Sequence, residues 1–89
     1  MSSGMVVDLE ALERFINTLR KFDDDLADSV SKLSTHFRQL GDVWRDSQYT
    51  EFAKEWEEAL TAIQTYLDDS PDQIKFLRRK ADVVNDYFR

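Results

Sequence analysis

The chain has 89 residues and a formal net charge of −6, with two glycines, one proline and no cysteine. This length fits one small domain, and the scarcity of helix-breaking residues predicts an all-α protein. Without cysteine there can be no disulfide, thiolate metal site or cysteine nucleophile, and the negative charge disfavours nucleic acid and anionic membrane surfaces as partners.

Residues 1–7 are expected to be a disordered tail or a cloning remnant, and residues 8–89 a single helical-hairpin domain. The sequence contains neither a long apolar run nor a basic and then apolar N-terminus, so it predicts no transmembrane helix and no general secretory signal peptide. We therefore expect a cytoplasmic protein, or one secreted without such a signal peptide, with no membrane insertion.

The first predicted helix follows Asp8, whose side chain is a suitable N-cap. Its apolar residues recur at alternating spacings of three and four, which is the heptad pattern of a helix packed along one seam. With Leu9 as heptad position a, only Asp23 breaks the apolar rule. The seam consists of Leu9, Leu12, Ile16, Leu19, Asp23, Leu26, Val30, Leu33, Phe37, Leu40 and Trp44.

The stretch from Leu40 to Phe52 interrupts this pattern, and we interpret it as the bend of a hairpin. Beyond it, Ser70 and Pro71 resemble a helix start, with Ser70 as N-cap, so the second helix is predicted to be kinked or restarted near Pro71. The heptad pattern nevertheless runs through this point. Its seam consists of Tyr49, Ala53, Trp56, Leu60, Ile63, Leu67, Ser70, Ile74, Leu77, Ala81, Val84 and Phe88.

The two seams can be tested against each other, because folding back at a bend pairs residues whose numbers have a constant sum. If Trp44 lies opposite Tyr49, then the two polar seam residues, Asp23 and Ser70, also meet. This coincidence predicts an antiparallel hairpin with a buried polar layer. The Asp23 carboxylate is expected to accept from the Ser70 hydroxyl or from a freed backbone N–H near the proline.

The positions beside the seam indicate where a partner would bind. In an antiparallel pair the heptad g positions of both helices lie on one side and the e positions on the other, here called the g side and the e side. Of the two kinds of row beside the seam, only the g rows contain large aromatic residues, and the e rows contain none. A broad apolar face on a two-helix unit predicts dimerisation into a four-helix bundle, through a face formed by Phe15, Phe22, Val43, Phe52, Ala59, Tyr66 and Tyr87.

An alternative interpretation concerns the four rings of this face. In it, the side chains extend over the seam of their own hairpin and make no dimer contact; these are Phe15, Phe22, Tyr66 and Tyr87.

The expected partner is the chain itself or a related hairpin protein, and a larger secreted protein or secretion component is a further candidate.

No catalytic residue, metal ligand or cofactor is predicted. The helical neighbours of His36 include no hydroxyl and no orienting carboxylate, so His36 is expected to be a surface or interface residue, with a pH-sensitive contact as the alternative. The aspartates around Asp23 and Asp69 are expected to form a solvated belt and not a cation site. A basic cluster of Lys75, Arg78, Arg79 and Lys80 is expected to be neutralised by Glu10, Glu13 and Asp82.

The bend carries a resemblance to a known family. Trp44-Arg45-Asp46 between two amphipathic helices, with Leu40 before it and Phe52 after it, resembles the motif of the Trp-Xaa-Gly (WXG) family of small helical-hairpin proteins associated with bacterial type VII (ESX) secretion. The resemblance extends from about Asp8 to the end of the chain. It implies a non-enzymatic dimer of two hairpins, exported as a folded pair or acting as an adaptor for a larger exported protein.

Two positions differ from that family. Asp46 replaces the glycine of the motif, and we expect Asp46 to be the N-cap of the second helix, with Ser47 as the alternative. The family's export signal, a tyrosine followed four residues later by an acidic residue, is not matched at Tyr66 or Tyr87, so we expect a partner to carry it. The alternative functions are an intracellular coiled-coil adaptor or regulatory subunit that is not exported, and an enzyme or metal protein built on the acidic belt.

Overall fold

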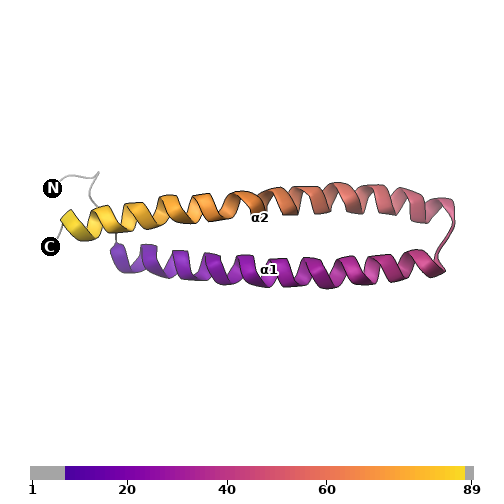
Figure 1. Cartoon of the computed structure of the whole chain (residues 1–89), viewed down its shortest axis with the longest axis horizontal. Coiled ribbons are helices and arrows are strands. Elements are labelled where there is room, and N and C mark those ends of the chain that lie inside the picture. Colours follow the sequence, from indigo (N-terminus) through magenta and orange to yellow (C-terminus); the bar gives the residue numbers. More distant parts are fainter. Residues whose placement is uncertain (1–7, 88–89) are drawn as a thin grey trace.

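The computed structural model describes residues 8–87, which form two helices joined by a short bend. Helix α1 spans Leu9–Val43 and α2 spans Ser47–Tyr87. The helices run antiparallel and side by side (Figure 1), and no strand occurs in this part of the chain. The predicted all-α helical hairpin is thereby confirmed. The predicted tail of residues 1–7 and the predicted seam residue Phe88 lie outside the described residues.

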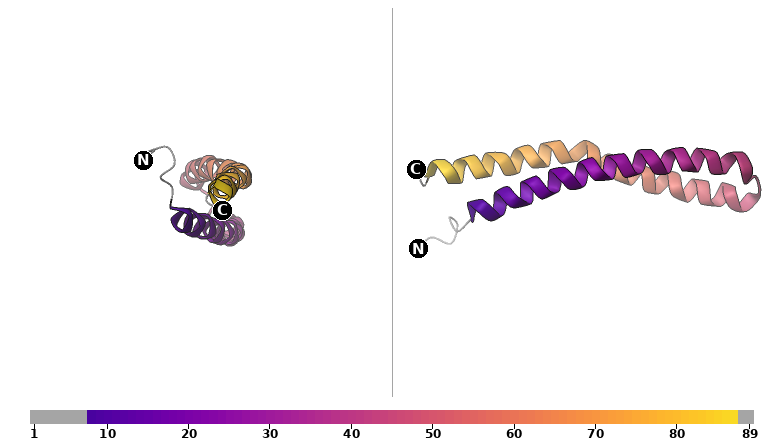
Figure 2. Two further views of the ribbon diagram at one scale, coloured as in Figure 1. Left: turned by 90° about the vertical axis from the view of Figure 1, so that its left-hand side faces the viewer. Right: turned by 90° about the horizontal axis from the view of Figure 1, so that it is seen from below.

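The hairpin is a rod with extents of 64 × 19 × 16 Å. Its two helices stay in contact along the rod and cross when seen from below (Figure 2). Such crossing is expected where a seven-residue apolar repeat keeps one stripe of each helix against the other.

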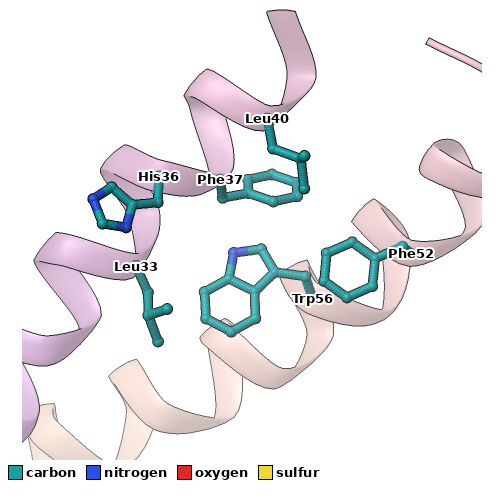
Figure 3. A pocket seen from close by; sticks show the side chains of 6 residues that line it. All are labelled: Leu33, His36, Phe37, Leu40, Phe52 and Trp56. Atoms are coloured by element: carbon teal, nitrogen blue, oxygen red, sulfur yellow. The ribbon is translucent and has the colours of Figure 1, made fainter. Parts of the chain in front are cut away.

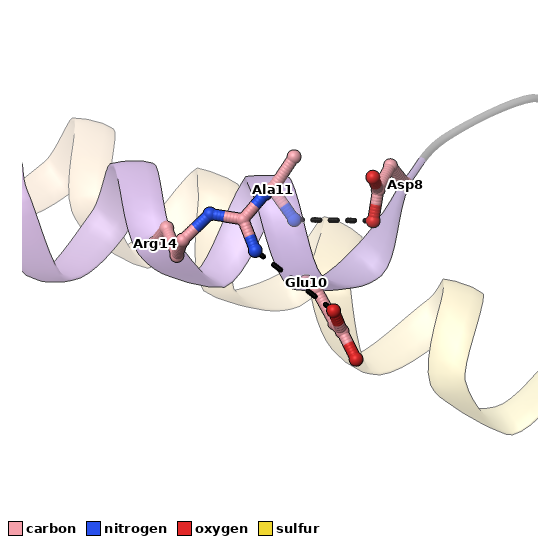
Figure 4. Close-up of polar contacts among 4 residues, drawn as sticks. All are labelled: Asp8, Glu10, Ala11 and Arg14. Atoms are coloured by element: carbon pink, nitrogen blue, oxygen red, sulfur yellow. Dashed lines mark hydrogen bonds and ion pairs between the residues drawn. The ribbon is translucent and has the colours of Figure 1, made fainter.

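Helix α1 begins where the sequence predicts. The Ala11 N–H donates to the Asp8 carboxylate at 3.2 Å (Figure 4). The Leu12 N–H donates to the Asp8 carbonyl at 2.9 Å. The Asp8 N-cap is therefore confirmed. Figure 4 also shows Arg14 and Glu10 pairing at 3.9 Å on the exposed surface, a contact that contributes little to stability.

The second helix was predicted to be kinked or restarted near Pro71, and the restart is wrong. Helix α2 continues without a break from Ser47 to Tyr87 with Pro71 inside it. Pro71 has no N–H to donate to the carbonyl of Leu67, one turn earlier, so one helical hydrogen bond is lost at that point. Ser70 does not cap a new helix, because its hydroxyl donates to Asp23 on α1 instead.

The closed part of the core lies in the half of the rod that contains the start of α1. Ile16, Ala81 and Val84 are buried there, and Val30 is buried near the middle. Toward the bend the seam is more open, since Leu33 and Leu40 are 52% and 36% exposed. The hairpin alone therefore leaves the bend half of its apolar seam incompletely covered.

Aromatic rings replace aliphatic packing in the bend half. The Phe37 ring lies 5.7 Å from Tyr49 and 6.1 Å from both Phe52 and Trp56, measured between ring centroids. Gly41 allows Tyr49 to pack this closely, because a Cβ at position 41 would lie 2.6 Å from the Tyr49 hydroxyl oxygen. The constant sum that pairs Trp44 with Tyr49 also pairs Phe37 with Trp56, and these two rings are in contact.

Candidate functional site

A polar layer joins the two helices near the middle of the rod. The Tyr66 hydroxyl donates to Asp23 Oδ1 at 2.7 Å, and the Ser70 hydroxyl donates to Asp23 Oδ2. Ser70 is only 1% exposed. The predicted layer of Asp23 and Ser70 is thus present, and each carboxylate oxygen has a hydroxyl donor.

Tyr66 takes part in this layer in a way that the heptad pattern does not reveal. It was predicted on the dimer face, but its hydroxyl reaches Asp23 on the seam. Its ring packs against Phe22 in a T-shaped arrangement, with 6.1 Å between the ring centroids. The Tyr66 hydroxyl therefore follows the alternative interpretation, in which the side chain extends over the seam of its own hairpin. Its four-residue spacing from Ser70 was the available signal, because residues four apart on a helix can approach the same group on the facing helix.

The polar layer gives Tyr66 an unusual titration. The hydrogen bond to the Asp23 carboxylate is the main cause that raises the pKa of Tyr66 above its ordinary value of 10.0, and desolvation adds to it. Because the folded pKa is raised, the contribution of Tyr66 to stability is full below pH 10 and is lost as the pH rises through the folded pKa.

We expect tyrosinate absorbance to show one tyrosine that ionises later than the others, and we expect this late step to disappear in the Y66F variant. The D23N variant should also bring the step to lower pH, because it removes the negative charge that opposes ionisation. An unchanged titration in D23N would contradict the assigned contact.

The bend is closed by the two motif residues Trp44 and Asp46. Asp46 Oδ1 accepts from the N–H groups of Gln48 at 2.9 Å and Tyr49 at 3.1 Å, and also from the Trp44 indole Nε1–H at 2.9 Å. Asp46 is therefore the N-cap of α2, as predicted, and Ser47 is the first helical residue. A glycine at position 46 would provide none of these three contacts.

Trp44 ends α1 and starts the aromatic packing of the bend. Its N–H donates to the Leu40 carbonyl at 2.9 Å while its backbone turns to an extended conformation. The indole ring lies 5.5 Å from Tyr49, edge to face, and 6.3 Å from Phe52. The predicted pairing of Trp44 with Tyr49 is confirmed, so three separate points of the predicted register agree along the rod.

The three donors of the cap also affect the Asp46 carboxylate. The hydrogen bond from the Tyr49 N–H, followed by that from the Trp44 indole, lowers the pKa of Asp46 below its ordinary value of 3.8. A lowered folded pKa means that the charged cap stabilises the fold above that value and that this stabilisation is lost as the pH falls through the folded pKa.

We expect D46A to lower the Tm by several degrees at neutral pH, because the first N–H groups of α2 lose their acceptor. The matched control D46N keeps an acceptor oxygen and should lose much less. Thermal melts followed by circular dichroism at several pH values measure both effects. The difference between wild type and D46A should shrink as the pH falls below about 4; a constant difference would contradict a charged cap.

An open apolar groove, here called the bend groove, lies on the g side next to the bend. It has a volume of about 330 Å³, and α1 and α2 both line it. Figure 3 shows the Trp56 and Phe52 rings facing the side chains that descend from α1. The bend groove is lined by Leu33, His36, Phe37, Leu40, Phe52 and Trp56.

The two long sides of the rod differ in chemistry as the heptad rows predict. A second apolar hollow on the g side includes Phe22, Ala62 and Tyr66. The corresponding hollow on the e side instead includes charged groups of Arg20 and Lys75. The structure therefore places the predicted g residues of the two helices on one side, which is the more apolar one.

The predicted dimer-face residues are largely accessible. Val43 is 82% exposed, and Ala59 is also exposed. Phe52 is exposed in part while it packs against Phe37 and Trp44. The large apolar members of the predicted face that remain exposed are Phe15, Phe22, Val43, Phe52 and Tyr87.

Two residues of this face were not predicted. Phe76 and Val83 are 63% and 60% exposed. Both occupy heptad position c, which lies next to g around a helix, so they extend the apolar g side of α2. An apolar residue at c beside an apolar g row was the sequence signal that could have identified them.

Several charged residues have clear positions. Arg78 pairs with Glu13 across the helices at 3.9 Å, as expected for the basic cluster, whereas Glu10 pairs with Arg14 on its own helix. His36 is exposed at the edge of the bend groove. Within residues 8–87, no group of three or more histidines and carboxylates could hold a metal ion, and neither helix has a segment long and apolar enough to cross a membrane.

Comparison of the chain with protein-family models, with curated proteins and with solved structures finds no match.

Proposed function

We propose that this chain is a non-enzymatic, WXG-like interaction protein that acts as a dimer, packs its g side into a four-helix bundle, and serves as a type VII secretion substrate or a secretion-associated adaptor. The observation that carries the proposal is the contrast between the two long sides of the rod. Large apolar side chains are exposed on the g side, and the hollow on the e side contains charged groups. Exposed apolar patches of this kind mark interaction surfaces.

The size of the g side is sufficient for a stable interface. It extends along a rod 64 Å long, a length over which an interface burying roughly 800 Å² on each partner can form. The small closed core of the hairpin gives a second reason, because a domain of this size gains stability when a partner covers its apolar surface.

Sedimentation velocity of the purified protein tests the dimer. We expect a dimer at micromolar concentration, dissociating into a less stable hairpin on dilution. A monomer that remains well folded at all micromolar concentrations would contradict the proposal of a homodimer, and titration with a related hairpin protein would then test a heterodimer.

Secretion requires a separate experiment. The protein is expected in the culture medium of cells with an active type VII system and should be retained when the secretion ATPase is deleted. Strictly cytosolic protein in secretion-competent cells would instead favour the adaptor that is not exported. One observation supports that second candidate, because the residue four positions after Tyr66 is Ser70, a buried hydroxyl bonded to Asp23 and not an exposed carboxylate.

A further inference from the structure

The hollow on the e side, here called the e-side hollow, lies beside the polar layer. It has a volume of about 450 Å³, and its apolar lining comes from Leu67, Pro71 and Ile74 of α2 together with Ala27 of α1. Ala27 has too short a side chain to fill the space between the helices. The e side therefore has an apolar recess of its own, separate from the g side.

Two cations stand beside this recess. Arg20 on α1 and Lys75 on α2 both line the e-side hollow, and both are exposed. The register that places Asp23 opposite Ser70 brings Lys75 to within about 3 Å of the level of Arg20 along the rod. Within residues 8–87 the ion pairs are formed by other side chains, so the hairpin supplies no counterion to either cation.

The two carboxylates of the e-side hollow leave these cations free. Asp23 accepts from two hydroxyl groups of α2, one at each of its oxygens. Asp24 is exposed and lies one turn after Arg20, but it forms no ion pair in the described part of the chain. A ligand that binds both cations therefore brings its own negative charge and competes with Asp24.

Pro71 adds a backbone acceptor to the same hollow. Because a proline has no N–H, the Leu67 carbonyl lacks its helical donor, and both residues line the e-side hollow. A backbone acceptor without a partner favours a ligand that carries N–H donors. Peptides carry such donors, whereas fatty carboxylates do not.

From the two cations, the apolar lining and this acceptor we infer that the e-side hollow binds an acidic peptide segment of another protein. A carboxylate of the segment lies between Arg20 and Lys75, and a neighbouring apolar side chain packs against Leu67 and Ile74. The volume of the hollow is in the range of sites that enclose a small ligand, so it accommodates an acidic side chain and one apolar neighbour.

The inference rests on the proposed function, in which an adaptor binds a larger protein, and adds the site and the chemistry of that contact. The proposed dimer covers the g side and leaves the e side accessible. An anionic membrane matches the e-side hollow less well, because it attracts extended basic clusters and repels a chain with a net charge of −6.

Fluorescence anisotropy with a labelled peptide tests the site. The probe is a short helical peptide in which leucine and glutamate recur at helical spacing, and its control has glutamine in place of every glutamate. We expect the glutamate peptide to bind about tenfold more tightly than the control at low salt. The R20Q/K75Q variant should weaken binding by about tenfold or more, and D24N should strengthen it by about threefold because the competing carboxylate is lost.

Two further variants separate the hollow from general charge attraction. R79Q/K80Q removes two exposed cations of α2 that do not line the e-side hollow, so it changes the net charge equally and should alter the affinity by less than about twofold. A27F fills the hollow without changing the charge and should weaken binding by about tenfold. All the substituted residues are exposed, and circular dichroism confirms that each variant folds.

Equal losses in R20Q/K75Q and R79Q/K80Q would overturn the inference. So would binding of decanoate, or of vesicles rich in phosphatidylserine, in place of the acidic peptide. Sedimentation velocity of the same samples reports the dimer separately. A dimer that binds no acidic peptide contradicts only the e-side site, whereas a monomer that binds the peptide through Arg20 and Lys75 supports this site and contradicts only the proposed dimer.

Discussion

The D23L variant is expected to lose about 2 kcal/mol of unfolding free energy, mainly because the Ser70 hydroxyl keeps its place in the seam and loses its acceptor. Ser70 is 1% exposed and donates to Asp23, so water cannot replace the lost contact without opening the helix pair. Urea denaturation at one fixed protein concentration measures the change, since the stability of a dimer depends on concentration.

Two controls isolate the cause. D24L changes the neighbouring exposed aspartate and should alter stability by no more than about 0.5 kcal/mol. The double variant D23L/S70A removes acceptor and donor together and should recover most of the loss, because an apolar pair suits the seam. If D23L/S70A is as unstable as D23L, the unpaired hydroxyl is not the reason for the loss.

The F15S/F76S variant is expected to weaken dimerisation by about a hundredfold or more, the largest effect on association that we predict. Each ring is more than half exposed in the hairpin, so burying it at an interface contributes about 1.5 kcal/mol or more, and a symmetric dimer buries each ring twice. Sedimentation equilibrium measures the Kd, and circular dichroism at high concentration reports whether the helices remain.

The matched control also replaces an apolar residue with serine, but at the edge of the g side. Val43 is 82% exposed at the very end of α1, so V43S should weaken the dimer much less than the two ring substitutions. The result that would contradict the g-side interface is an unchanged Kd in F15S/F76S. Equal losses in V43S and F15S/F76S would show that the rings have no special place in the contact.

The polar layer explains why the hairpin has one register. An apolar heptad seam alone permits neighbouring registers that differ by a whole repeat, because each places apolar residues opposite one another. Only the observed register brings Asp23 to both the Ser70 and Tyr66 hydroxyls. A shift by one repeat would bury a carboxylate against aliphatic side chains without a donor, which is costly.

The sequence could predict the fold, the register and the caps because they depend on local or periodic properties. Heptad spacing determines which stripe of each helix is buried, and the coincidence of the two polar seam residues fixes the alignment. Asp8 and Asp46 cap their helices through contacts within three residues, which the order of residues alone can specify.

Other features depend on side-chain reach and on the space between the helices. The sequence suggested a helix start at Ser70, but the helix continues through Pro71 because a proline costs one hydrogen bond whereas the seam packs on both sides of it. Tyr66 is a second residue whose contacts the heptad position alone did not predict. Its position predicted a dimer contact, but its side chain is long enough for the hydroxyl to reach Asp23 within the hairpin.

The sequence by itself determined a two-helix hairpin with one apolar and one polar long side, since residue spacing fixes the direction in which each side chain leaves a helix. Only the tertiary structure decided where that apolar side is hollow and where it projects. Packing between facing residues of unequal size leaves Leu33 and Leu40 partly open near the bend and closes the seam around Ile16. That difference depends on pairs of side chains that are far apart in the chain.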